Sequence, residues 1–145
     1  MSIAQTTTTS FRVELFEAVH DFTTDTFKIA LYTGAASIGP ITTAYTSDGE
    51  TSGTGYTAGG NTLTVNTSPT YGNNTAGIPT AYIGFANTTW SSASFTARGA
   101  LIYNSSKGNK SVAVLDFGAD KTVAGTTFTI QFPTADANSA IVRIS

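Results

Sequence analysis

The chain contains no cysteine, a single histidine (His20) and few charged residues of either sign. Disulfide bonds are therefore excluded as a source of stability, and we expect no zinc site. Acid–base, nucleophilic and metal-assisted catalysis all use titratable side chains gathered at one place, and this sequence has few to gather. The composition indicates a non-catalytic domain whose stability comes from packing or from partners, but it does not name a function.

Charge is also scarce, with a formal net charge of −2 over 145 residues. No cluster of lysine or arginine is present, so we expect no nucleic-acid partner. No apolar run approaches the ~20 residues that span a bilayer, so we expect no membrane partner. The first residues lack the basic and apolar stretches of a secretory signal. Low charge gives little repulsion between copies, which favours a homo-oligomer.

The length predicts one domain, since domains usually hold roughly 100–200 residues. We place it at residues 10–145, after an extended, threonine-rich arm at residues 1–9. β-Branched threonine favours extended backbone. Two interpretations of the arm stay open. It is a frayed terminus, or it reaches a neighbouring subunit, in which case Thr6, Thr7, Thr8 and Thr9 bind the partner.

One helical pattern follows the arm. Phe11, Leu15 and Val19 recur at helical spacing after Ser10, which is a suitable N-cap, and Glu14 falls on the opposite side. A helix this short needs tertiary packing. We therefore expect it to cover one end or flank of a β-structure.

From residue 26 onward the apolar period becomes two, which is typical of strands. Short alternating segments separated by Gly, Asn and Ser predict an antiparallel β-sandwich or barrel, and the sequence does not choose between the two. Residues 104–109 have the composition of a hairpin loop. The glycine-rich stretch 34–60 is a long loop, or it hides a strand at 42–46. The strands are expected at 27–32, 61–67, 80–87, 95–104, 111–118, 127–133 and 140–145.

His20, Asp21 and Asp25 lie close together between the helix and the first strand. They could form a small metal site, but aspartates in turns also bond nearby backbone N–H groups. A zinc site needs further His or Cys ligands that the chain does not have. We interpret the three residues as turn and capping groups.

Two other patterns have a superficial likeness to ligand sites. The glycine-rich run 53–60 lacks the Lys-Ser/Thr ending of a P-loop and does not precede a helix, so a tightly turned β-connection is the better interpretation. Asp116, Asp120 and Asp136 do not have the spacing of a calcium loop. We expect no catalytic, cofactor-binding or metal-binding residue and assign no cofactor.

Four aromatic residues fall in or beside Gly/Ser/Thr-rich segments: Tyr45, Tyr56, Tyr71 and Trp90. Exposed tyrosines in such places stack on sugars or anchor protein contacts. Alternatively, each covers an end of the β-core. We predict that Tyr45, Tyr56 and Tyr71 bind a partner and assign Trp90 to the core.

Five segments together resemble a small β-rich virion structural protein family of tailed bacteriophages. The resemblance covers most of the chain from about residue 10 onward. Its motifs carry no chemistry and imply a β-rich component of a phage particle. The segments are 19–33, 53–60, 97–104, 113–118 and 132–136.

The resemblance suggests a capsid decoration, or cement, protein on the capsid surface of the virion, made in the host cytoplasm. Its partners would be the major capsid protein and copies of itself. Each contact would favour the assembled shell over the dissociated one by mass action. The alternative is a tail- or fibre-associated β-module that binds a receptor or carbohydrate.

Overall fold

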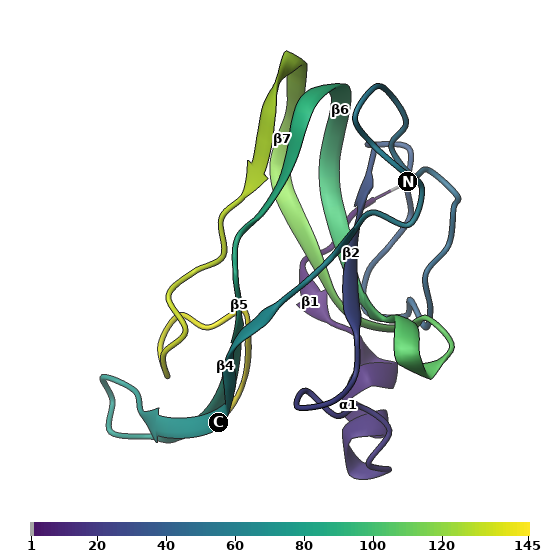
Figure 1. Cartoon of the computed structure of the whole chain (residues 1–145). Coiled ribbons are helices and arrows are strands. Elements are labelled where there is room, and N and C mark those ends of the chain that lie inside the picture. Colours follow the sequence, from purple (N-terminus) through teal and green to yellow (C-terminus); the bar gives the residue numbers. More distant parts are fainter. Residues whose placement is uncertain (1) are drawn as a thin grey trace.

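The computed structural model describes residues 2–145, and half of the chain is strand (Figure 1). The elements in order are β1 (Thr6–Thr7), α1 (Thr9–Phe16), β2 (Phe27–Tyr32), β3 (Asn61–Thr62), β4 (Val65–Asn73), β5 (Pro79–Phe85), β6 (Thr88–Asn104), the 3-10 turn η1 (Ser105–Lys107), β7 (Lys110–Ile130) and β8 (Val142–Ile144). The expected fold class, antiparallel β with one short N-terminal helix, is confirmed.

The strands form two antiparallel sheets that do not close into a barrel. The five-stranded sheet has the order β1-β7-β6-β2-β3, and the three-stranded sheet has the order β4-β5-β8. An apolar core draws side chains from both sheets, including Ile29 of β2 and Ile83 of β5, and from Phe11 of α1. The sequence left sandwich and barrel as alternatives, and the structure excludes the barrel.

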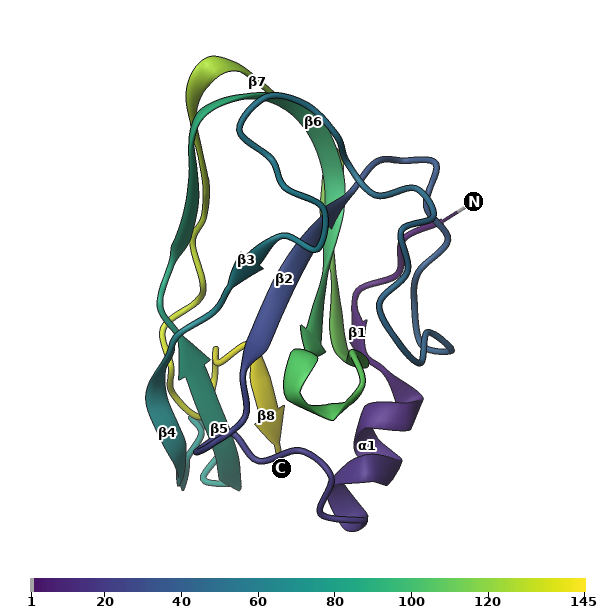
Figure 2. The ribbon, with the colours of Figure 1, turned by 45° about the vertical axis from the view of Figure 1, so that its right-hand side comes forward.

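A long hairpin of β6 and β7 links the two layers. Its turn is η1, where the sequence predicted a hairpin loop. Near Ala97 and Gly99 the pairing shifts register, and the two strands curve over together toward the second layer (Figure 2). The sequence split β7 into 111–118 and 127–133 because the residues between are exposed and lack an apolar alternation. Backbone hydrogen bonds to β6, rather than burial of side chains, hold that middle part in the strand.

Helix α1 is shorter than the apolar periodicity indicated. It begins at Thr9 with Thr8, not Ser10, as the N-cap, and it ends at Phe16. Ala18 adopts a left-handed conformation, with φ of 57°, so Val19 lies outside the helix. The helix packs Phe11 into the main core, as expected of an element that covers one end of the sheets.

A second, smaller core lies on the opposite face of the five-stranded sheet and includes Tyr32, Ile38, Leu101 and Val114. The long segment 34–60 covers it. No strand forms at 42–46, where the structure has only an isolated bridge between Ala44 and Lys110. This cover explains why the strand residues below it are buried on both faces.

Candidate partner-binding surfaces

The threonines of the N-terminal arm lie against their own chain. Thr6 and Thr7 form β1 and pair with β7. Thr8 is fully buried, accepts a hydrogen bond from Phe11 N at 3.3 Å and lies 2.8 Å from Ser111 Oγ. Thr9 alone of the four is exposed. The structure therefore leaves Thr8 inaccessible to a partner and uses it as a helix cap.

The residues before β1 also pack against their own chain. Ile38 N donates to Ser2 O at 3.1 Å, and Ala4 N donates to Ile38 O at 3.0 Å. Ile3 packs against Gly99. A Cβ added to Gly99 would come within 2.8 Å of Cγ2 of Ile3. A glycine makes this close approach possible. The arm thus forms part of the cover over the second core.

Tyr45 and Tyr56 meet at a single carboxylate, that of Glu50. Both hydroxyls donate to it at 2.7 Å, to Oε2 and Oε1 respectively, and Gly59 N donates to Oε1 at 2.7 Å. Burial, followed by the hydrogen bond to Glu50, raises the pKa of Tyr45 to about 12. Burial likewise raises the pKa of Tyr56. These two tyrosines fasten the 34–60 segment, a role that the sequence did not reveal because Glu50 had no recognisable motif.

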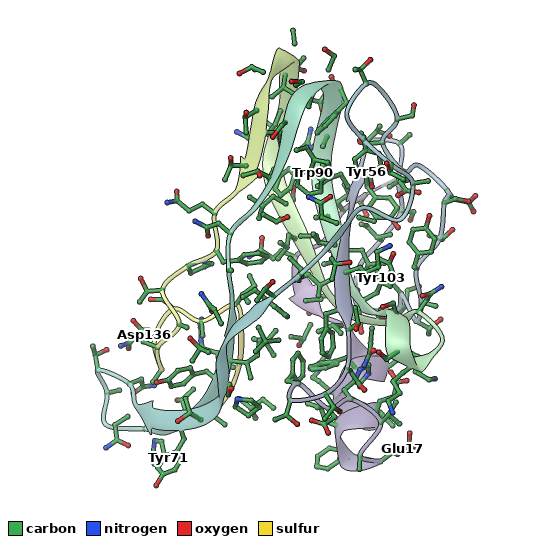
Figure 3. All side chains as sticks on the ribbon, in the orientation of Figure 1. Glu17, Tyr56, Tyr71, Trp90, Tyr103 and Asp136 are labelled. Carbon is green, nitrogen blue, oxygen red and sulfur yellow. The ribbon has the colours of Figure 1, made fainter. Side chains whose placement is uncertain are left out.

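Tyr71 is separated from the other two tyrosines. It lies on β4 with 79% of its surface exposed, and Figure 3 places it at the far end of the molecule from Tyr56 and Tyr103. Trp90 is buried at 3% exposure and packs edge-on against Phe95, as expected of a core residue. Of the three predicted tyrosines, Tyr71 has the exposure that a binding residue needs.

Asp21 and Asp25 act as turn residues, the interpretation favoured from sequence. Asp21 Oδ1 accepts from Thr23 N at 2.9 Å, and Asp25 Oδ2 accepts from Asp21 N at 3.0 Å. Hydrogen bonds from the Thr23 side chain and backbone are the main cause that lowers the pKa of Asp21. Across residues 2–145, no group of three or more His, Asp or Glu side chains is arranged to hold a metal ion.

A buried polar network lies beside that turn, and one of its members contradicts the sequence pattern. Glu14 was expected on the outer side of the helix but is buried, at 6% exposure. Its carboxylate accepts from Lys110 Nζ at 2.9 Å and lies 3.5 Å from His20 Nε2. Asn104 Nδ2 donates to His20 Nδ1 at 3.1 Å. The network joins α1 to the β6–β7 turn, so Glu14 stays buried because it has partners.

Large apolar side chains are exposed at the helix end of the molecule. Phe16 is 94% exposed, Val13 is 52% exposed and Ile41 is 91% exposed. Thr9 N donates to Pro40 O at 2.9 Å, which places Ile41 beside the start of α1. We call Val13, Phe16 and Ile41 the helix patch; it runs along α1 from Ile41 beside the first residue to Phe16 at the last. Periodicity analysis did not find it because Ile41 comes from a distant loop.

Comparison with known proteins finds no matching family model, no matching curated protein and no matching solved structure. Within residues 2–145, the structure contains no helix long and apolar enough to cross a membrane.

Proposed function

We propose that this protein is a phage virion structural protein that decorates the outer capsid shell and stabilises it. The sequence resemblance suggests the particle, and the helix patch is the observation that carries the surface role. Phe16 and Ile41 are almost fully exposed, although both are large apolar residues. Val13 and Phe16 are three residues apart and so lie on one face of α1, and exposed apolar side chains that adjoin on a surface mark an interaction site.

Stabilisation by such a contact follows from mass action. A protein that binds the assembled shell and not its dissociated subunits shifts the equilibrium toward the shell. Phe16 would insert into a pocket on the major capsid protein, as buried aromatic anchors do at interfaces. Low net charge leaves little repulsion between neighbouring copies on the lattice.

The test is co-sedimentation of the purified protein with empty capsid shells that lack it. The wild-type chain should bind and raise the temperature at which the shells dissociate. Phe16→Ser should weaken binding roughly 30-fold, which corresponds to a hot-spot loss of about 2 kcal/mol. Tyr71→Ser, which changes an exposed aromatic outside the helix patch, is the matched control and should bind normally. Absence of wild-type binding to shells would sink the proposal.

Tyr71 favours the second candidate, a tail- or fibre-associated module that binds a receptor or carbohydrate. An exposed tyrosine on a hairpin is suited to stacking on a sugar ring. Cryo-EM of assembled particles separates the candidates. Density for this fold on the capsid supports decoration, whereas density at the tail alone, with adsorption lost in Tyr71→Ser, supports the alternative.

A further inference from the structure

Each sheet ends in a strand with one unpaired edge, and the two edges border the same groove. β1 is the last strand of the five-stranded sheet, and β8 is the last strand of the three-stranded sheet. A hollow of about 380 Å³ is lined by Thr6 and Thr7 on one side and by Ile141 and Arg143 on the other. Figure 2 shows β1 and β8 in the two separate layers. The sandwich is therefore open between these strands.

The groove continues toward α1. A second hollow, of about 470 Å³, shares Thr7 and Arg143 with the first and adds apolar walls from Phe11, Leu15 and Ile144. Phe11 is buried and Leu15 is half-buried, whereas Ile144 is 55% exposed. An occupant would therefore have apolar walls at the α1 end of the groove and more polar ones between β1 and β8.

Backbone geometry suggests what fits there. The outer edge of a terminal strand presents N–H and C=O groups that no neighbouring strand uses. An extended peptide added beside such a strand makes main-chain hydrogen bonds, and its alternate side chains enter pockets on one face. The groove offers two such edges, with apolar pockets at the α1 end.

Two arginines in the groove indicate the charge of the occupant. Arg12 and Arg143 both line the α1 end of the groove. Among residues 2–145 neither forms an ion pair, because the Arg12 guanidinium contacts Thr9 Oγ1 and that of Arg143 donates to Ala140 O. A carboxylate on the partner would give each arginine a charge-assisted hydrogen bond. A lysine there would be repelled.

We infer that this groove binds an extended segment of a partner protein in which apolar and acidic residues alternate. The segment adds as a strand to β8 in the space between β8 and β1. Its apolar side chains contact Phe11, Leu15 and Ile144, and its carboxylates face Arg12 and Arg143. Phe16 of the helix patch also lines the second hollow, so the two surfaces adjoin. The inference is nevertheless separate from the proposed function, because it concerns strand addition at β8 and does not need a capsid.

The probe is a short blocked peptide that alternates valine with glutamate, titrated into the ¹⁵N-labelled full chain and followed by NMR. Two control peptides carry lysine in place of each glutamate, or N-methyl groups that block strand pairing. Amide shifts should be concentrated at residues 6–7 and 142–144. The glutamate peptide should bind at least tenfold more tightly than either control.

Variants of the protein give the matched comparison. Arg143→Glu should reverse the preference between the glutamate and lysine peptides, whereas Arg98→Glu, an equal charge reversal outside the groove, should leave it unchanged. No binding, equal binding of all three peptides, or shifts elsewhere would overturn the inference. Self-association through the same amides without peptide binding would also overturn it, in favour of a second copy. Shell binding is measured separately, so either proposal can fail alone.

Discussion

The hydroxyl of Tyr56 donates to Glu50 Oε1 at 2.7 Å and accepts from Leu31 N at 2.9 Å. One phenol therefore connects the 34–60 segment to the backbone of β2. The contact lies between two elements whose order in the sequence gives no sign that they meet. It acts beside other hydrogen bonds that hold the segment to the sheet, such as those from Thr51 N to Leu31 O and from Tyr103 Oη to Gly59 O.

Tyr56→Phe should lower the free energy of unfolding by about 1–3 kcal/mol, because it leaves the buried N–H of Leu31 without this acceptor and removes one of the three hydrogen bonds to the Glu50 carboxylate. Urea denaturation measures this value. Tyr71→Phe is the control, since its side chain is exposed, and should change stability by less than about 0.5 kcal/mol. Equal effects of the two substitutions would contradict the role of Tyr56.

Gly60→Ala should prevent normal folding or cost on the order of 4 kcal/mol or more. Gly60 has φ of 73°, and an added Cβ would overlap Ile29 O. Gly77 has φ of 77° but open space around it, so Gly77→Ala should cost only about 1–2 kcal/mol. Thermal unfolding of both variants separates backbone strain from collision. Similar losses would show that strain alone governs Gly60.

Thr8→Ala should destabilise the protein by about 1–2 kcal/mol, because it removes the N-cap of α1 and the contact with Ser111. Thr9→Ala, one residue later, changes an exposed helical position and should be nearly neutral. Circular dichroism melts of the two variants measure the difference. If Thr9→Ala were the more damaging, the helix start would be misplaced.

His20 should make stability depend on pH below neutrality. Burial, opposed in part by Glu14, lowers the pKa of His20 from the usual 6.5. The unfolded chain therefore binds a proton more readily than the folded one. The contribution of neutral His20 to the free energy of unfolding is therefore complete above about pH 6.5. It is lost as the pH falls through the folded-state pKa.

His20→Gln removes this titration and keeps a hydrogen-bonding side chain. The difference in unfolding free energy between wild type and variant should be constant above about pH 7 and shift against the wild type as the pH falls below the usual histidine pKa of 6.5. Carboxylates shared by both proteins cancel in this difference. Parallel curves across the whole range would show that His20 does not titrate differently on folding.

The sequence predicted the elements whose pattern is local. β2 is found where the alternation of Phe27, Ile29 and Leu31 placed it, and η1 occupies the predicted hairpin loop. The N-cap of α1 lies two residues before the predicted one, because Thr8 and Ser10 are both good caps and local sequence does not choose between them. The middle of β7 is exposed on both faces and has no alternation of apolar residues, so no sequence pattern indicated a strand there.

The candidate surfaces were less accessible to sequence reasoning. Tyr45, Tyr56 and Tyr71 have similar Gly/Ser/Thr-rich surroundings in the chain, yet two bind Glu50 and one is exposed. Local composition cannot separate them, since the difference depends on where a distant carboxylate lies. The groove between β1 and β8 requires the two sheet edges to face each other, which no local pattern encodes.

The sequence by itself determined that the protein is an antiparallel β-structure with one short helix, because apolar periods of two and of 3.6 residues select strands and helices locally. Tertiary structure alone decided that the two sheets stay open, that the N-terminal arm and the 34–60 segment cover a second core, and that Glu14 is buried. Those outcomes depend on contacts between residues far apart in the chain. Their free energies are realised only when the whole molecule has packed.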